Sequence, residues 1–325
     1  MQSFAYANPA TVQEAVALLS AKWGEADVLA GGTDLISLMK EHLHTPKRVV
    51  NIKNIKELEG IQKTGAGIRI GALVTMDELA KNADVKAAAK VLSEAAAAIP
   101  SPQIRHMGTV GGDLCQRPRC WYFRQGFGLF AMKDGRSMIP DGANQYHAIF
   151  GGGPAYFVSA SSLGPALVAL GAKVKLVSAK GPREVPAADF FVVPQNETSR
   201  EIALHPDEIL TEILIPAGTV HSATYEVRQK EALDWPLATC SVVLHMRGHV
   251  VASAKVVMGH VAPKPWDSPE AAKAITGKAI TAETAEAAGK AAVAGAQPLS
   301  QNAYKATLAR VAVKRALLEA AKQKA

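Results

Sequence analysis

The sequence predicts an α+β protein made of three consecutive units. Capping-box patterns at Thr11–Glu14 and Thr75–Glu78 introduce helical stretches, and short apolar runs between them have the length of strands. The last third combines a hairpin pattern with two helical stretches. With 325 residues, 48% of them hydrophobic, the chain can form two or three domains with cores of their own.

The first two units cover about residues 1–53 and 54–218. In the first, a helix is expected from Thr11 to Lys22, and the apolar strand 28–30 stops at a diglycine. In the second, an alanine-rich helical stretch follows Thr75 as far as Ala98, and an irregular section is expected from about 108 to 153. The other expected elements are a helix over 34–40, order over 166–170, and strands over 48–52, 68–70, 173–177 and 209–215.

The third unit covers residues 219–325. The runs 241–246 and 250–258 are expected to be strands joined by the turn Arg247-Gly248-His249. Pro263-Lys264-Pro265 is expected to separate this sheet from the helical part of the unit. Two helices are then expected over about 282–294 and 302–322.

The composition argues against several classes of protein. The net charge of +7 comes from Lys and Arg spread along the chain, so nucleic-acid binding is not expected. No apolar run has the length of a membrane span, and the N-terminus lacks a secretion pattern. Three cysteines (Cys115, Cys120 and Cys240) are too few for a disulfide framework. We expect a cytoplasmic protein; export together with a signal-bearing partner is the alternative.

A first candidate site is the turn between the strand at 28–30 and the helix at 34–40. Its diglycine permits backbone angles closed to other residues, and converging N–H groups in such a turn can bind an anion such as a pyrophosphate. Taken alone, a purely structural turn is the simpler interpretation. The residues of this loop are Leu29, Ala30, Gly31, Gly32, Thr33, Asp34 and Leu35.

A second loop about eighty residues later has the same ingredients. Two such loops suggest a ligand that is held from both sides, and a dinucleotide has a diphosphate centre with two arms. Neither loop matches the Rossmann fingerprint or the Walker P-loop. The residues of the second loop are Gly108, Thr109, Val110, Gly111, Gly112 and Asp113.

Both loops resemble the FAD loops of the medium, flavin-binding subunits of the molybdenum hydroxylases. This family includes xanthine dehydrogenases, carbon monoxide dehydrogenases and aldehyde oxidoreductases. The resemblance extends over nearly the whole chain. It is carried by the segments 30–35, 101–113, 187–191, 207–210, 215–216, 259–263 and 308–311.

The resemblance implies a two-part FAD-binding domain of the vanillyl-alcohol-oxidase (PCMH) type over 1–218, with subdomains at about 1–53 and 54–218. A smaller C-terminal domain of the CO-dehydrogenase flavoprotein type, with an antiparallel sheet and helices, would occupy 219–325. The two loops would wrap the FAD diphosphate, Leu210 would pack near the flavin, and Arg228 would place a cation near its ring. Without the resemblance, Leu210 would be ordinary core and Arg228 an exposed strand charge.

Two positions depart from the family's pattern. The family often has Asn where this chain has Asp113, and a carboxylate cannot donate the amide's hydrogen bond. Many members also have an acidic residue where this chain has Ser162. Either change could shift the affinity or the potential of the flavin.

The implied function is electron transfer. A large subunit would carry the molybdenum cofactor, a small subunit would carry [2Fe–2S] clusters, and FAD on this chain would pass electrons to NAD⁺, oxygen, a quinone or a protein. A dimer of heterotrimers is the assembly that the family suggests. The alternatives are a self-sufficient FAD oxidoreductase and a flavin-free bridging subunit. No catalytic or metal-ligating residue is assigned on this chain.

Cys115 and Cys120 raise the question of whether this chain binds a metal cluster. The segment 114–124 resembles a subgroup that binds an extra [4Fe–4S] cluster, which needs four thiolates. Only two cysteines lie here, so we do not expect this cluster. The loop would then keep Arg117, Pro118, Trp121 and Tyr122 for packing or docking. His147 lies in a segment that is close to the flavin in that subgroup, and one histidine gives no evidence of catalysis.

Overall fold

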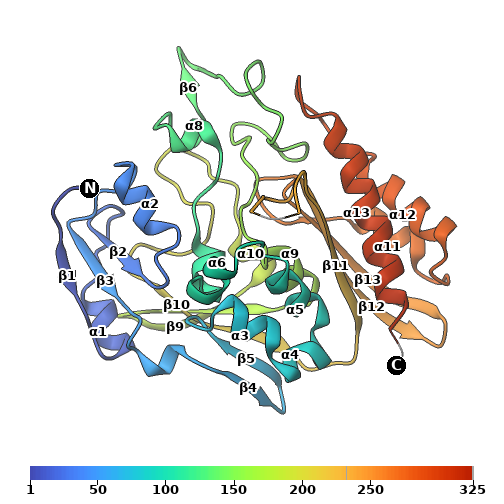
Figure 1. Cartoon of the computed structure of the whole chain (residues 1–325), viewed down its shortest axis with the longest axis horizontal. Helices are drawn as coiled ribbons and strands as arrows, with labels where there is room; N and C mark the ends of the chain where they lie inside the picture. Colours follow the sequence, from blue (N-terminus) through green and yellow to red (C-terminus); the bar gives the residue numbers. More distant parts are fainter. Residues whose placement is uncertain (232, 324–325) are drawn as a thin grey trace.

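The computed structural model describes residues 1–231 and 233–323. Figure 1 shows three β-sheets side by side, with a small hairpin projecting away from them. The N-terminal sheet lies at one side of the molecule and the C-terminal helices α11, α12 and α13 at the other. The α+β class is therefore confirmed. Within the described residues, no helix is both long and apolar enough to cross a membrane.

The first sheet has three parallel strands in the order β1-β3-β2. Helix α1 ends at Ala17, earlier than the predicted Lys22, because the N–H groups of Leu18 and Leu19 turn back in tight i→i−3 bonds. Thr11 caps this helix, but Glu14 bonds the N–H of Ala10 rather than that of Thr11. The elements are β1 (Ala5–Ala7), α1 (Val12–Ala17), β2 (Ala26–Leu29), α2 (Leu35–Lys40) and β3 (Arg48–Asn51).

The second sheet has five antiparallel strands in the order β4-β5-β10-β8-β9. Two strands distant in sequence, β5 and β10, are therefore neighbours at its centre. The main hydrophobic core contains side chains from this sheet and from helices α3, α5 and α9. The elements are η1 (Lys56–Leu58), β4 (Ile61–Thr64), β5 (Gly67–Gly71), α9 (Gly164–Ala169), β8 (Lys173–Ser178), β9 (Gly181–Pro186), α10 (Ala187–Phe190) and β10 (Ile209–Pro216).

The alanine-rich stretch forms three short helices rather than one. The predicted capping box is present, with both reciprocal bonds between Thr75 and Glu78. Asn82 ends the first helix and caps the second, because its side chain accepts the N–H of Val85 at 3.0 Å. Ala89, at φ −144°, separates the second helix from the third. The helices are α3 (Met76–Lys81), α4 (Ala83–Ala88) and α5 (Lys90–Ala97).

The section from 108 to 153 is less irregular than predicted. Its diglycine belongs to a short helix, because Thr109 caps the N–H of Gly112 at 3.1 Å. A two-stranded hairpin follows and forms the projection in Figure 1. The elements of this region are α7 (Val110–Cys115), α8 (Trp121–Arg124), β6 (Met132–Lys133) and β7 (Arg136–Ser137), and α6 (Pro102–Met107) comes directly before it.

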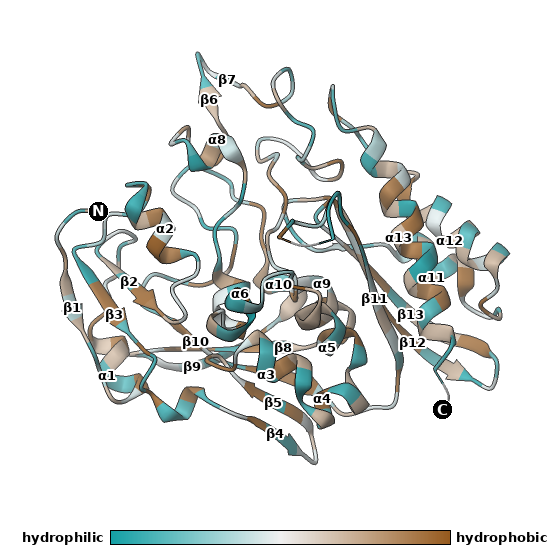
Figure 2. Cartoon of the chain, viewed as in Figure 1, coloured by the Kyte–Doolittle hydropathy of each residue, from teal (hydrophilic) through white to brown (hydrophobic). Residues whose placement is uncertain are grey.

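The third sheet is antiparallel, in the order β11-β12-β13-β14, and helices α11 to α13 pack against it around a core of their own. Figure 2 shows hydrophobic and hydrophilic residues alternating along α12 and α13, as one-sided packing requires. The segment 263–265 does not end the sheet, because Trp266 pairs with Met258. The elements are β11 (His221–Val227), β12 (Ala238–Arg247), β13 (Val250–Gly259), β14 (Trp266–Asp267), α11 (Pro269–Ile275), α12 (Ala282–Val293) and α13 (Tyr304–Ala321).

Buried Lys305 ties α13 to the rest of the chain. Its ammonium group donates to the carbonyl oxygens of Tyr146 at 3.1 Å, His147 at 3.0 Å and His260 at 2.7 Å. No carboxylate takes part among the described residues. Burial lowers the pKa of Lys305 from its usual 10.5 to about 7.

The first prediction concerns this lysine. Between about pH 7 and 10.5 the unfolded chain keeps the proton that folded Lys305 has lost, so stability should increase with pH. Relative to Lys305→Met, the wild type should gain up to about 1.4 kcal/mol per pH unit. Denaturant unfolding of both proteins at pH 7, 8.5 and 10 measures this difference. A difference that stays constant over this range would contradict the assignment.

Candidate functional site

The first glycine loop exposes a row of unpaired backbone donors. Strand β2 ends at Leu29, and Gly32 takes a φ of +74°, which glycine adopts without strain. Among the described residues, no acceptor bonds the N–H groups of Gly31, Gly32, Thr33 and Asp34, which we call the donor row. Four successive unpaired N–H groups in a turn form a concave site for an anion.

The second glycine loop supports the first one through a direct backbone contact. A Cβ atom on Gly31 would lie 1.8 Å from the carbonyl oxygen of Met107 and 3.3 Å from the Cα of Gly108. The two backbones therefore touch, and only glycine fits at position 31. The N–H groups of Val110 and Gly111 are already paired with Val74 and Ala72. The two loops thus differ: the first supplies free donors, and the second supplies support.

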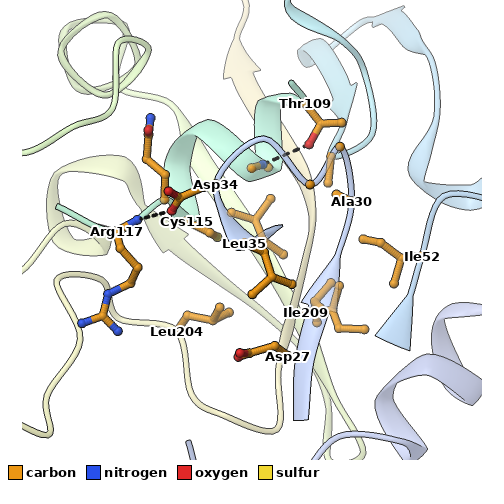
Figure 3. Close-up of a pocket in the computed structure, with 18 of the residues that line it drawn as sticks. Asp27, Ala30, Asp34, Leu35, Ile52, Thr109, Cys115, Arg117, Leu204 and Ile209 are labelled. Atoms are coloured by element: carbon orange, nitrogen blue, oxygen red, sulfur yellow. Dashed lines mark hydrogen bonds between the residues drawn. The ribbon is translucent and has the colours of Figure 1, made fainter. Parts of the chain in front are cut away.

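Two cavities meet at these loops. The first cavity, of about 160 Å³, has an apolar end that includes Val28, Ile209 and Leu210, and Figure 3 shows Ile209 beneath the loop. The second cavity, of about 310 Å³, runs toward Arg228 and Trp235. Both cavities share Thr33, Asp34, Thr109, Gly112 and Gln116.

The predicted site residues distribute between these cavities. Leu29 and Val110 line neither; Val110 is buried in the core, and Leu29 lies at the end of β2, where its Cδ1 would be 3.2 Å from a Cβ on Gly32. Those that line the first cavity alone are Ala30, Gly31, Gly32, Leu35, Gly111 and Leu210. Those that line the second alone are Gly108, Asp113 and Arg228. Leu210 and Arg228 therefore lie in different cavities.

The Asp34 carboxylate faces the protein rather than the cavities' ligand space. It accepts the backbone N–H of Arg117 at 2.8 Å and pairs with Arg124 at 2.8 Å and Arg119 at 3.0 Å. Figure 3 shows the bond from Arg117 to Asp34. Burial opposes its ionisation, but the charges of Arg119 and Arg124 hold the pKa of Asp34 below its usual value. Asp34 thus fastens the first glycine loop to the segment 117–124.

Asp113 holds a different segment in place. Its carboxylate accepts the hydroxyl of Ser161 at 2.5 Å and the N–H groups of Ser162 at 3.2 Å and Leu163 at 3.1 Å. Burial raises the pKa of Asp113, and these bonds oppose the rise. The groups that meet this side chain are donors, which explains why an acceptor-only carboxylate fits where the family often has an amide.

Arg228 is a paired cation inside the second cavity. Its guanidinium donates to the Glu226 carboxylate and to the carbonyl oxygen of Ala98. Burial raises the pKa of Glu226, and the charge of Arg228 opposes this rise. The interpretation as an exposed strand charge is therefore wrong.

Further arginines at the first cavity could not be found from the sequence. Arg200 stacks over the ring of Trp23 at 4.7 Å and donates to the carbonyl oxygen of Cys115 at 3.1 Å. Arg117 pairs with Glu201 at 3.1 Å, and burial lowers the pKa of Arg117 to about 10. Residues 23, 117 and 200 belong to distant segments without a shared motif, so only folding brings these charges together.

The two loop cysteines lie in different surroundings. Cys115 packs against the main core, whereas the Sγ of Cys120 lies 3.1 Å from Nε2 of His147. Burial raises the pKa of both thiols, that of Cys115 to about 12, and burial lowers the pKa of His147 to about 4. Cys120 and His147 are therefore a neutral hydrogen-bonded pair. Among the described residues, no group of three or more His, Cys, Asp or Glu side chains is arranged to hold a metal ion.

Two family models together match almost all of the chain. The FAD-binding domain of molybdopterin dehydrogenases matches residues 2–218, and the C-terminal domain of CO dehydrogenase flavoproteins matches residues 223–320. The chain belongs to the FAD-binding medium subunits of the molybdenum hydroxylases. The resemblance seen in the sequence is thereby confirmed.

Individual relatives agree with this membership. The carbon monoxide dehydrogenase medium chain of Hydrogenophaga pseudoflava is 31% identical over 97% of this chain and 96% of its own length. The aldehyde oxidoreductase FAD-binding subunit of Escherichia coli K12 is also 31% identical, over 99% of this chain and all of its own length. A solved carbon monoxide dehydrogenase structure from Hydrogenophaga pseudoflava superimposes with a TM-score of 0.76 at 30% identity, covering 98% and 97% of the two chains.

The second prediction concerns Gly31. Gly31→Ala should force the two glycine loops apart, because its Cβ would overlap the Met107 carbonyl oxygen. We expect a loss of about 1–3 kcal/mol in the free energy of unfolding, typical of overpacking. Gly65→Ala is the matched control, since a Cβ there meets nothing within 4 Å. Denaturant unfolding measures both, and equal stabilities would contradict the contact.

A third prediction concerns the reactivity of Cys120. Because burial raises its pKa, little thiolate exists at pH 7.5, and iodoacetamide should alkylate Cys120 more slowly than a free thiol. Mass spectrometry of the peptide that contains Cys120 gives the rate, with glutathione as the reference thiol. Alkylation as fast as that of glutathione would show that the pKa of Cys120 is not raised.

Proposed function

We propose that this chain is the electron-transfer flavin subunit of a heteromeric molybdenum hydroxylase. It would accept electrons from [2Fe–2S] clusters of a small subunit and pass them to an external acceptor, while a large subunit carries the molybdenum cofactor. The observation that carries this proposal is the donor row at the junction of two cavities. Bound FAD supplies the chemistry of taking up electrons and releasing them to a second partner.

The site fits FAD at its centre. A diphosphate needs hydrogen-bond donors, and the donor row presents four N–H groups that have no acceptor among the described residues. Thr33 is exposed, lines both cavities and can add its hydroxyl. The nearby guanidinium groups of Arg117 and Arg119 favour negative charge here.

The two cavities would hold the two arms of the cofactor. The larger second cavity suits the three-ring flavin, with Arg228 at its wall, and the apolar end of the first cavity suits adenine, with Leu210 against it. In this arrangement, Leu210 contacts the adenosine arm rather than the flavin ring. Glu226 offsets much of the charge of Arg228, so the pair would tune the ring less than an unpaired arginine.

A self-sufficient oxidoreductase is less well supported. Such an enzyme needs a free acid or base in the flavin cavity. The carboxylates that line the second cavity all have partners: Asp34 and Glu226 pair with arginines, while Asp113 and Asp234 accept N–H groups. These residues position backbone and side chains instead of offering a proton acceptor to a substrate.

The assembly follows from the same proposal. Residues 1–218 would form the flavin domain, with parts at about 1–53 and 54–218, and residues 219–325 would form the C-terminal domain. The relatives are medium chains of larger enzymes, which supports a complex with a large and a small subunit. A dimer of such heterotrimers is the arrangement that we propose for the whole enzyme.

A fourth prediction tests the cofactor. The purified chain should show flavin absorption bands, and acid should release about one FAD per chain and no iron. Thr33→Phe should fill the junction of the cavities and weaken FAD binding by roughly tenfold or more. Thr45→Phe is the matched control, because Thr45 is exposed and lines neither cavity.

The outcomes separate the candidate functions. A colourless chain that cannot be reconstituted with FAD would overturn the proposal and leave a bridging subunit. Equal FAD affinity in both variants would show that FAD does not bind at the donor row. Turnover of a small substrate by the isolated FAD-loaded chain would favour a self-sufficient oxidoreductase.

A further inference from the structure

A third cavity, of about 200 Å³, lies directly beside the second. The two cavities share Arg119, Asp234, Trp235 and Pro236 as a common wall. The guanidinium of Arg119 stacks over the ring of Trp235 at 4.9 Å, which joins the segment after the second glycine loop to the C-terminal third of the chain. FAD, as placed above, leaves this third cavity free.

Aromatic rings line much of the third cavity. Trp121 and Tyr146 lie 5.4 Å apart between ring centroids, and Trp235 and Phe157 contribute further rings. Such walls favour a flat, apolar ring system. Its volume is below the roughly 300–1,000 Å³ typical of pockets for drug-sized ligands, so a small ring fits better than a dinucleotide.

The polar groups of the third cavity are neutral or positive except for the carboxylate of Asp234. Burial together with the charge of Lys305 lowers the pKa of His147 to about 4 and that of His260 to about 3. Each of these rings keeps one buried nitrogen without a partner among the described residues. The carboxylate of Asp234 accepts the N–H groups of Gln229, Lys230 and Trp235.

This charge pattern selects among electron acceptors. The positive charge of Lys305 and Arg119 at the third cavity is partly offset, because Arg119 pairs with Asp34, the pKa of Lys305 is about 7, and the Asp234 carboxylate lines the same cavity. A cationic nicotinamide ring would face Arg119 and Lys305 as well as Asp234, whose carboxylate is already held by backbone N–H groups. A neutral ring with carbonyl oxygens can accept hydrogen bonds from the donors in these walls.

We propose that the third cavity binds the external electron acceptor and that this acceptor is a small quinone. The inference rests on the proposed flavin function. The shared wall of Arg119 and Trp235 would bring the quinone next to the flavin cavity. Reduction of the quinone takes two electrons and two protons: the reduced flavin gives up both electrons and one proton, solvent gives the second proton, and both carbonyl groups become hydroxyl groups.

Binding is measured without turnover, on the oxidised FAD-loaded chain. The probe is tetramethyl-1,4-benzoquinone, because its fully substituted ring has no position for addition of the Cys120 thiol. Saturable quenching of tryptophan fluorescence and a shift of the flavin absorption bands report binding beside the flavin. We expect both signals to appear over the same quinone concentrations. Quenching that never saturates would show that the quinone does not bind at a specific site and would overturn the proposal.

A pair of variants locates the quinone. Tyr146→Ala removes an aromatic wall of the third cavity and should weaken quinone binding by roughly tenfold. Phe127→Ala is the matched control, because Phe127 is also an exposed aromatic residue but lines none of the three cavities. Equal affinities in the two variants, or tighter binding of NAD⁺ than of the quinone, would overturn the proposal.

The FAD content of each sample separates the two proposals. A chain without FAD fails the flavin proposal. A chain with one FAD, unchanged in Tyr146→Ala, and no quinone binding fails only the acceptor proposal.

Discussion

The site depends on the contact between the backbones of the two glycine loops at Gly31. A side chain there would overlap the Met107 carbonyl oxygen, so the loops can meet only through glycine. This contact holds the donor row against the end of α6 at Met107 and Gly108, where the first and second cavities meet. Separating the loops would separate the cavities, and a ligand with a charged centre and two arms would lose its central support.

Acidic residues keep the flexible parts of this site in one geometry. Asp34 fixes the first loop to the arginine segment, Asp113 fixes the start of α9, and Glu226 fixes Arg228. Each carboxylate is largely buried and accepts hydrogen bonds from donors of the protein, which is the condition under which buried charge is tolerated. Acidic residues of a ligand-binding motif can therefore bond mainly to groups of the protein rather than to the ligand.

Local patterns in the sequence predicted local structure well. The capping box at Thr75 and the hairpin at Gly248 depend on residues a few positions apart, and both are present. The helix through Gly111 was missed because glycine disfavours helices, and its stability comes from contacts with Ala72 and Val74 that are distant in sequence. Likewise, no local pattern could place Arg200 over Trp23.

Local sequence patterns also could not show how the two glycine loops divide the work of the site. The two loops have similar sequences, which suggested that both bind the ligand in the same way. The first loop supplies free N–H groups, whereas N–H groups of the second are already bonded to the carbonyl oxygens of Val74 and Ala72. Hydrogen-bond saturation depends on which backbone lies opposite each loop, and this is decided by the pairing of distant segments. The sequence could therefore name most of the residues around the cavities but not the division of work among them.

Electrostatic control of the third cavity comes from the opposite end of the chain. Lys305 belongs to α13, yet its ammonium bonds the carbonyl oxygens of His147 and His260, and its charge adds to the burial that lowers the pKa of both imidazoles. The aromatic wall and the positive charge thus come from separate segments, which meet only when the C-terminal helices pack. Because the charge lies deep in the protein, salt in the solvent screens it weakly, and the preference for a neutral acceptor should persist across ionic strengths.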